Sequence, residues 1–175
     1  MADRILLDTR FLRCVDRDGW IFVERPHVRG VVVIVALTDD RKLLLVEQHR
    51  PPLARATIEL PAGLVGDDPD HAHEDLAAAA RRELREETGY DARRIVHLAN
   101  CPSSPGMTSE MASFLRATEL RRVGDGGGVG DERIRVHEVP LDGAVAWLQE
   151  RAAAGTPVAA KVYAGLFLLQ QAGAY

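Results

Sequence analysis

Short runs of apolar residues separated by polar turns predict strands in the first part of the chain. Residues 10–15 and 20–25 form one such pair, and the turn between them contains Asp-Gly, which predicts a hairpin. Residues 30–37 are a continuous run rich in β-branched residues, which is typical of a strand covered on both faces. After a polar turn, residues 43–48 return as a second buried strand. The pattern therefore predicts an outlying hairpin followed by the strands of a core.

The middle of the chain changes to a helical pattern over residues 72–88, which are rich in Ala, Leu, Glu and Arg. Pro69 and Asp70 suit the start of this helix, and Gly89 suits its end, because helices commonly stop at a glycine in the left-handed conformation. The other predicted elements are strands over residues 95–99, 112–118 and 134–139, a flexible glycine-rich stretch over 123–130, and helices over 142–154 and 158–170. This order predicts a mixed sheet with helices on its faces.

Composition and charge narrow the class of protein. The chain has 175 residues, with 22 Lys and Arg against 26 Asp and Glu, and a formal net charge of −4. This length fits one domain with a sizeable core, and the lack of a Lys/Arg stripe argues against a nucleic-acid binder. The longest apolar run, residues 31–37, is far shorter than the roughly 20 residues of a membrane helix. We therefore expect a soluble protein that binds neither nucleic acid nor membrane.

The expected compartment is the cytoplasm. The first residues, MADRILLDTR, are charged and lack the apolar stretch of a signal peptide. Cys14 and Cys101 show neither metal-ligand spacing nor a disulfide framework, which suits a reducing environment.

Three glutamates of the predicted helix fall on one face. Glu83 and Glu87 are one turn apart, about 40° around the helix axis, and Glu86 lies about 60° to the other side of Glu83. Like charges this close repel one another unless cations lie among them, and Mg²⁺ or Mn²⁺ prefers oxygen ligands. The simpler interpretation is a solvated helix surface with ion pairs such as Arg82 with Glu86. For the three glutamates taken alone, the simpler interpretation is favoured.

A longer pattern favours the metal site over the solvated surface. Glu74 is followed by seven residues and then by residues 82–90, which read Arg-Glu-Leu-Arg-Glu-Glu-Thr-Gly-Tyr. This pattern resembles the signature of the Nudix hydrolase family at each position from Glu74 onward. The family places five residues between the first glycine of the signature and this glutamate, whereas ten residues separate Gly63 from Glu74 here. We interpret the extra five, within residues 64–73, as a lengthened loop before the helix.

The resemblance extends over nearly the whole chain. Residues 46–51 and 59–63 look like the segments before the signature in ADP-ribose pyrophosphatases, and residues 104–110 look like the loop that marks that subgroup. The likeness is strongest to the nucleoside diphosphate sugar hydrolase branch, where residues 20–25 and 161–166 also have counterparts.

The resemblance implies an α/β fold, namely the Nudix α/β/α sandwich with a mixed sheet and a small N-terminal β-hairpin region. Residues 1–28 are expected to form this N-terminal β region and to mediate a homodimer, with a swap of the region between subunits as one arrangement. Residues 29–175 are expected to form the Nudix hydrolase domain.

The family also implies a metal site. Mg²⁺, with Mn²⁺ as a substitute, is expected to be bound by the carbonyl of Ala62 and by the carboxylates of Glu83, Glu86, Glu87 and Glu132. Glu86 is expected either to bind the metal directly or to contact the groups that do. Arg82 is expected to orient one of these glutamates through a charge-assisted hydrogen bond.

Substrate contacts are implied for a second group of residues. Arg50 is expected to meet a phosphate, since a guanidinium matches two phosphate oxygens at once. Further contacts are expected from Leu64, Ser104, Pro105 and Gly106, largely through backbone atoms, and from Glu110, which is expected to face the sugar or the attacking water. In a swapped dimer, Glu24 and Arg25 are expected to reach the base beside Phe11 and Trp20, although packing is the simpler role for these two aromatic residues.

The sequence does not identify which carboxylate is the general base. Some relatives carry a catalytic glutamate two positions before the place of Glu132, where this chain has Gly130. The candidates are, in order, Glu110, Glu132, Asp131 and Glu86.

The implied reaction is Mg²⁺-dependent hydrolysis of the diphosphate in a nucleoside diphosphate sugar. ADP-ribose would give AMP and ribose 5-phosphate, and GDP-mannose would give GMP and mannose 1-phosphate. Two alternatives stand beside it: a Nudix enzyme for another nucleoside diphosphate derivative, and a non-catalytic sensor that binds ADP-ribose. The loop at residues 104–110 argues against the first, and the complete set of carboxylates argues against the second.

Overall fold

A computed structural model of the protein describes residues 3–67 and 69–173. Its strands are β1 (Arg4–Asp8), β2 (Arg13–Arg17), β3 (Trp20–Glu24), β4 (Gly30–Ala36), β5 (Lys42–Arg50), β6 (Arg55–Glu59), β7 (Ala62–Val65), β8 (Tyr90–Pro102), β9 (Met111–Arg122) and β10 (Ile134–Pro140). Its helices are α1 (Leu76–Thr88), α2 (Ala144–Ala153) and α3 (Ala160–Gln171), with 3₁₀ turns η1 (Pro51–Leu53), η2 (Pro69–His71) and η3 (Leu141–Gly143). The expected ranges 1–28, 29–175 and 64–73 include Met1, Ala2, Asp68, Ala174 and Tyr175, which lie outside the described residues.

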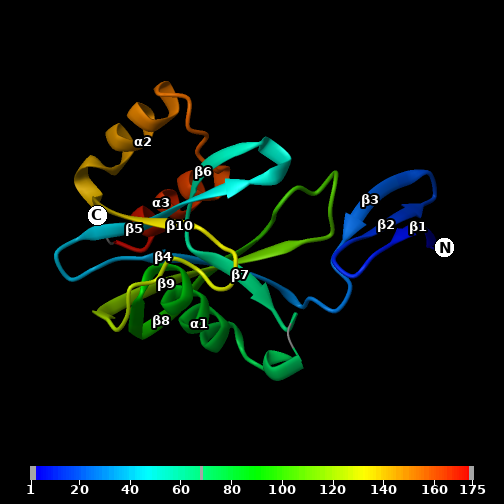
Figure 1. Ribbon diagram of the computed structural model, residues 1–175, viewed down its shortest axis with the longest axis horizontal. Coiled ribbons are helices and arrows are strands. Elements are labelled where there is room, and N and C mark those ends of the chain that lie inside the picture. The colour runs from blue at the N-terminus through cyan, green and yellow to red at the C-terminus, as the bar shows by residue number, and fades with distance from the viewer. Residues whose placement is uncertain (1–2, 68, 174–175) are drawn as a thin grey trace.

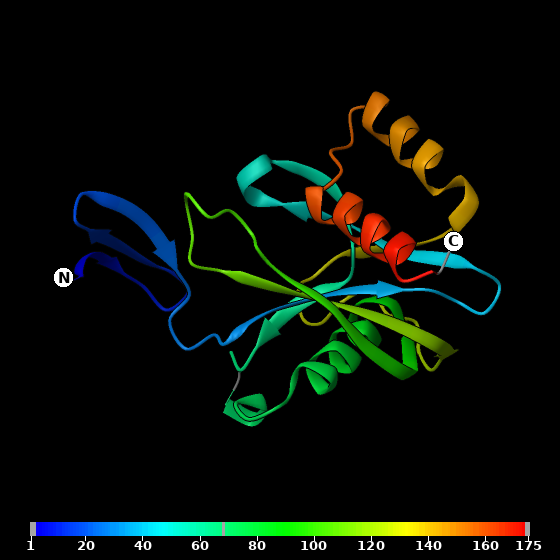
Figure 2. The same ribbon diagram turned by 180° about the vertical axis from the view of Figure 1, so that it is seen from behind.

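Two sheets form the body of the molecule, and helices cover them from two sides. One sheet has the strand order β7-β4-β9-β8, in which β4 and β9 run parallel and the other pairs antiparallel. The second has the order β10-β5-β6 and is antiparallel. Helix α1 lies on one side of these strands, and α2 and α3 lie on the other (Figures 1 and 2). The predicted mixed sheet between helices is confirmed.

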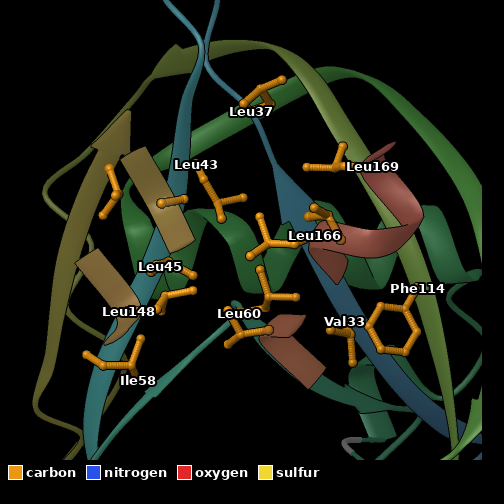
Figure 3. Packing of buried hydrophobic residues seen from close by; sticks show 14 of the residues in the cluster. Val33, Leu37, Leu43, Leu45, Ile58, Leu60, Phe114, Leu148, Leu166 and Leu169 are labelled. Carbon is orange, nitrogen blue, oxygen red and sulfur yellow. The ribbon is translucent and has the colours of Figure 1, made fainter. Parts of the chain in front are cut away.

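The core has two parts, and β4 contributes to both. Val33 and Val35 of this strand belong to the apolar cluster that includes α2 and α3, whereas Val32 and Ile34 belong to the cluster that includes α1. Figure 3 shows the first cluster, in which Leu60, Leu166 and Phe114 gather near Val33. All of these β4 side chains are fully buried, so the prediction of a strand covered on both faces is confirmed.

The N-terminal region is a three-stranded antiparallel sheet rather than a single hairpin. The predicted strand at residues 10–15 was misplaced: β1 ends at Asp8, and β2 begins at Arg13. The reason is a turn at Thr9, whose hydroxyl accepts the backbone N–H of Leu12 at 2.9 Å and donates to its carbonyl at 2.7 Å. The sheet projects from the body beside the loop that joins β8 to β9 (Figure 1), and a β-bridge joins Val23 to Thr108 in that loop.

Helix α1 begins four residues later than predicted, at Leu76 instead of residue 72. Asp75, and not Asp70, is its N-cap, because the Asp75 carboxylate accepts the backbone N–H of Ala78 at 2.7 Å. The helix ends as predicted at Gly89, which has a φ of 76° and donates its N–H to the carbonyl of Arg85.

The other predicted ranges shift at their ends. Strands β8 and β9 are much longer than residues 95–99 and 112–118, because they pair with each other along nearly their whole length. The helices predicted over residues 142–154 and 158–170 are observed as α2 and α3, each of which begins two residues later than predicted. The 3₁₀ turn η3 comes directly before α2. Within the described residues, we find no helix long and apolar enough to span a membrane.

Candidate active site

A cleft of about 450 Å³ lies between β4, β5, β6, β7, helix α1, the start of α3 and the loops that join the strands. A volume of this size suits a small-molecule ligand. Of the predicted site residues, the lining includes Arg25, Arg50, Ala62, Leu64, Glu83, Glu87, Glu110 and Glu132. It also includes Gln48, Glu59, Asp67 and Lys161, to which the sequence assigned no role. The structure therefore brings together residues that are up to 136 positions apart, from Arg25 to Lys161.

Helix α1 delivers two glutamates to this cleft from the border of its apolar face. Ala80 and Leu84 are fully buried in the cluster that the helix forms with the sheet, which turns Glu83 and Glu87 toward β7. The backbone N–H of Ala62 donates to Oε2 of Glu87 at 3.1 Å. A Cβ atom placed on Gly63 would lie only 1.9 Å from the Glu83 carboxyl group, so the Glu83 side chain keeps its present place only with glycine at this position.

Burial makes both carboxylates hard to ionise in the absence of a cation. The pKa of Glu87 is raised to about 8, mainly by desolvation and less by the charges of Glu83 and Glu132, although the hydrogen bond from Ala62 opposes this. Desolvation also raises the pKa of Glu83 to about 7, against the lowering effect of Arg82. Two adjacent buried acids with raised pKa values favour a bound cation, which would supply the missing counter-charge.

Arg82 is the centre of an ion-pair network at the edge of the cleft. It donates to Glu74 at 2.8 Å, to Glu83 at 2.8 Å and to Glu86 at 3.3 Å, and it also donates to the carbonyl of Leu64 at 3.2 Å. The bond to Glu83 has the geometry that the family resemblance implies, and its importance for activity stays a prediction. The carboxylate of Glu86 pairs with Arg82, and Glu86 is absent from the described lining of the cleft.

The residues fit a hard divalent cation in their chemistry. Among the residues that the structure describes, no three His, Cys, Asp or Glu side chains are already arranged as metal ligands. The carboxylates of Glu83, Glu87 and Glu132 nevertheless line the cleft, and oxygen is the ligand that Mg²⁺ and Mn²⁺ prefer. The raised pKa values of Glu83 and Glu87 reflect the desolvation of their carboxylates, which a bound cation would compensate. We therefore keep the metal site as a prediction that the chemistry of the donor set supports.

Arg50 occupies the cleft with its guanidinium already oriented. Glu59, on the neighbouring strand β6, accepts from its Nε at 2.6 Å and from its Nη2 at 2.7 Å. This two-fold hydrogen bond also raises the pKa of Arg50. Glu59 thus holds a planar cation at the wall of the cleft, a role that sequence reasoning missed because the two residues meet only through the pairing of β5 with β6.

Glu110 is held between two cations from distant parts of the chain. Its carboxylate accepts from Ser103 at 2.6 Å and from Arg25 at 3.2 Å, and Lys161 lies 3.6 Å from it. Burial raises the pKa of Glu110, but the Ser103 hydrogen bond and the charges of Lys161 and Arg25 more than offset this, so its pKa lies below the usual value. Glu110 therefore stays ionised at neutral pH. One sequence signal could have identified Lys161: it is one of only two lysines in the chain.

Several predicted substrate contacts lie elsewhere. The described lining of the cleft does not include Ser104, Pro105, Gly106, Glu24 or Asp131. Instead, the carbonyl of Gly106 accepts from the indole N–H of Trp20 at 3.2 Å, and Glu24 pairs with Arg13 at 3.3 Å. The loop thus packs against the N-terminal sheet rather than facing the carboxylates, and its role in binding stays a prediction.

Comparisons with known proteins identify the family of this chain. A family model described as the NUDIX domain matches residues 26–160. The chain is 34% identical over 125 residues both to the methanol dehydrogenase activator of Bacillus methanolicus and to the ADP-ribose pyrophosphatase of Bacillus subtilis (strain 168). Each of these matches covers 70% of this chain and 64% of the relative, so the chain spans just under two thirds of their length.

Two further matches span more of the chain. It is 30% identical over 167 residues to the GDP-mannose pyrophosphatase of Citrobacter koseri, which covers 85% of this chain and 84% of that protein. A crystal structure of an ADP compounds hydrolase superposes with a TM-score of 0.73 and 22% identity over 98% of this chain and 94% of that one, which shows a shared fold. Because the family model matches well over half of the chain, this protein belongs to the Nudix family and has its fold.

Proposed function

We propose that this Nudix protein hydrolyses the diphosphate bond of nucleoside diphosphate sugars, with ADP-ribose and GDP-mannose as the first substrates to test. The observation that carries the proposal is one cleft in which buried carboxylates on α1 share the walls with Arg50, Lys161 and Arg25. Such a cleft can bind a divalent metal and a diphosphate together. Relatives named ADP-ribose pyrophosphatase and GDP-mannose pyrophosphatase support the choice of substrates.

The proposed mechanism assigns each side chain a task. Glu83, Glu87, Glu132 and the carbonyl of Ala62 would hold Mg²⁺ or Mn²⁺, which when bound supplies counter-charge for the diphosphate and lowers the pKa of water. Arg50, oriented by Glu59, would donate to phosphate oxygens, and Lys161 would add a second positive charge. Water then forms a bond to phosphorus while the bridging P–O bond breaks, and the proton of the water passes to a carboxylate.

We propose Glu110 as the general base, with Glu132 as the second choice. Both line the cleft, and Glu110 is ionised because of its neighbours. Asp131 and Glu86 are less suitable, because neither belongs to the described lining. We also propose a reducing compartment, the cytoplasm, on the basis that Cys14 and Cys101 are both unpaired.

The direct test is a panel of nucleotide sugars assayed with and without Mg²⁺, with the products separated by chromatography. We expect ADP-ribose to give AMP and ribose 5-phosphate only when metal is present, and calorimetry with ADP-ribose to show binding. Binding without turnover of any member of the panel would contradict the proposal and favour the sensor.

Replacing Arg50 by lysine should weaken substrate binding. Lysine keeps the positive charge but not the two parallel N–H groups that Glu59 orients. We expect kcat/KM for ADP-ribose to fall about tenfold to a hundredfold, the effect of losing a charged hydrogen bond. Arg55→Lys is the matched control, because Arg55 pairs with Arg50 across the strands but is exposed and lies outside the described lining. Equal losses in the two variants would argue against a phosphate contact at Arg50.

We further propose that the protein is a homodimer that associates through the N-terminal sheet. This small sheet leaves large apolar side chains exposed, among them Ile5, Leu7, Phe11, Trp20 and Ile21, with exposed fractions of 53% to 69%. Exposed large apolar side chains gathered on one small sheet favour an interaction site.

Introducing charge on this sheet should separate the subunits. Leu7 and Ile21 lie on one face according to the strand register, so the double variant Leu7→Arg/Ile21→Arg is expected to be monomeric by light scattering, whereas the wild type is dimeric. Phe167→Arg is the control, because Phe167 is equally exposed but lies on α3. A monomeric wild type would refute the proposed dimer.

A further inference from the structure

The glycine-rich segment between β9 and β10 packs against the end of helix α1 (Figure 1). The N–H of Gly127 donates to the carbonyl of Glu87 at 2.9 Å, and the N–H of Gly128 donates to the carbonyl of Glu86 at 3.0 Å. These two carbonyls belong to the last turn of α1, where a helix has no partners of its own for its C=O groups. The segment therefore caps the same turn of the helix that carries the cleft glutamate Glu87.

Gly126 lies very close to the end of the helix in this contact. A Cβ atom on Gly126 would lie 2.4 Å from the carbonyl carbon of Thr88 and 2.6 Å from the backbone nitrogen of Gly89. Both are backbone atoms, which cannot rotate away as a side chain would. Gly126 also has a φ of 70°, a conformation that other residues rarely adopt. The docking of the segment on α1 thus depends on glycine at this position.

The docked segment leads directly to Glu132. The carbonyl of Gly127 accepts from the N–H of Ile134 at 3.2 Å, which closes residues 127–134 into a loop at the start of β10. Inside this loop, the N–H of Val129 donates to the Glu132 carboxylate at 2.9 Å, and the N–H of Glu132 donates back to the carbonyl of Val129 at 3.2 Å. Gly127 therefore bonds to the carbonyl of Glu87 through its N–H and to the loop that carries Glu132 through its C=O.

We propose that residues 126–134 form a positioning element that fixes Glu132 opposite Glu87 in the cleft, and that Gly126 is the positioning residue on which it depends. This inference rests on the proposed function, in which Glu132 is a metal ligand and a candidate base. An undocked stretch with this many glycines would have a large conformational entropy and would not hold a carboxylate at a fixed place. Docking on α1 removes that freedom and ties Glu132 to the helix that presents Glu83 and Glu87.

The test compares Gly126→Ala with Gly124→Ala in the full chain. A Cβ on Gly124 would meet no atom within 4 Å, and Gly124 has no left-handed φ, so this control is expected to keep full activity. For Gly126→Ala we expect kcat for ADP-ribose to fall about tenfold to a hundredfold, the cost of misplacing a catalytic group by about 1 Å, with KM changed less than twofold. Equal activity of the two variants would overturn the proposal.

A double variant shows whether Gly126 acts through Glu132. If it does, Gly126→Ala combined with Glu132→Gln should be no slower than Glu132→Gln alone, because both changes disable the same group. Losses that multiply would overturn the proposal.

Amide hydrogen exchange tests the docking without any assay of activity. The N–H groups of Gly127 and Gly128 should be protected in the wild type and in Gly124→Ala, and should exchange faster in Gly126→Ala. Unprotected amides in the wild type would overturn the docking. If the wild type hydrolysed no nucleotide sugar while these amides were protected, the proposed function would fail and the docking would stand.

Discussion

Replacing Glu87 by glutamine is expected to lower kcat for ADP-ribose by about a thousandfold, the upper range for removing one preorganised charged or polar group from an active site. Glutamine has the size of glutamate but no negative charge, so it cannot compensate a divalent cation. The Glu87 carboxylate lies against the N–H of Ala62 and is more buried than those of Glu83 and Glu86 on the same helix. The measurement is steady-state hydrolysis of ADP-ribose at saturating Mg²⁺.

We expect Glu87→Gln to lose activity without losing stability. Because desolvation already disfavours the charged form of Glu87, a neutral amide at this position should leave the melting temperature of the metal-free protein unchanged or higher. Glu150→Gln is the control, since Glu150 is an exposed residue of α2 outside the described lining. Glu87→Gln with the turnover of the wild type would remove Glu87 from the proposed metal site.

The helical part of the site was predictable because its information is local. The spacing of Glu83 and Glu87 and the position of Gly89 follow from the repeat of the α-helix and the chemistry of its C-terminus, and the structure places all three as the pattern indicates. The start of the helix was less certain, because Asp70 and Asp75 are both acceptable caps by residue type. Only the hydrogen bond to Ala78 selects Asp75.

The contacts that the other charged residues of the cleft make could not be predicted from the sequence pattern. Glu59 meets Arg50 because a turn brings β6 back along β5, and Lys161 meets Glu110 because α3 packs beside the sheet. Such contacts depend on strand pairing and helix packing between distant segments, which leave no periodic signal. The same limitation explains the loop at residues 104–110, whose residues divide between the cleft, at Glu110, and the N-terminal sheet, at Gly106.

Net charge gives an incomplete picture of such a site. The formal charge of −4 argues against a nucleic-acid binder, but it does not show that the cleft collects both acidic and basic side chains. Its lining includes Glu83 and Glu87 together with Arg50 and Lys161. With a divalent cation bound to the glutamates, the cation and the two basic side chains would attract phosphate. A mildly acidic protein can therefore bind a highly anionic substrate.

Replacing Gly63 by alanine is expected to lower kcat for ADP-ribose about a hundredfold while costing little stability. The new Cβ would lie 1.9 Å from the carboxyl group of Glu83 and 2.4 Å from its Cγ, so the Glu83 side chain must move out of its present place. Only the end of a flexible side chain has to shift, and Gly63 lacks the left-handed φ that would strain an alanine. A metal ligand displaced by about 1 Å is nevertheless enough for a loss of this size.

The stability and the activity of Gly63→Ala should therefore change independently, and this separation identifies Glu83 as the affected group. Gly143→Ala is the matched control, because Gly143 has a negative φ and a Cβ there would meet nothing within 4 Å. We expect both variants to melt within a few degrees of the wild type and only Gly63→Ala to lose activity. The double variant Gly63→Ala/Glu83→Gln should be as slow as Glu83→Gln alone, because the alanine acts by moving the side chain that the glutamine disables. Full activity in Gly63→Ala would mean that the contact between β7 and Glu83 does not set the position of the metal, and the metal-binding role would then rest on Glu87 and Glu132.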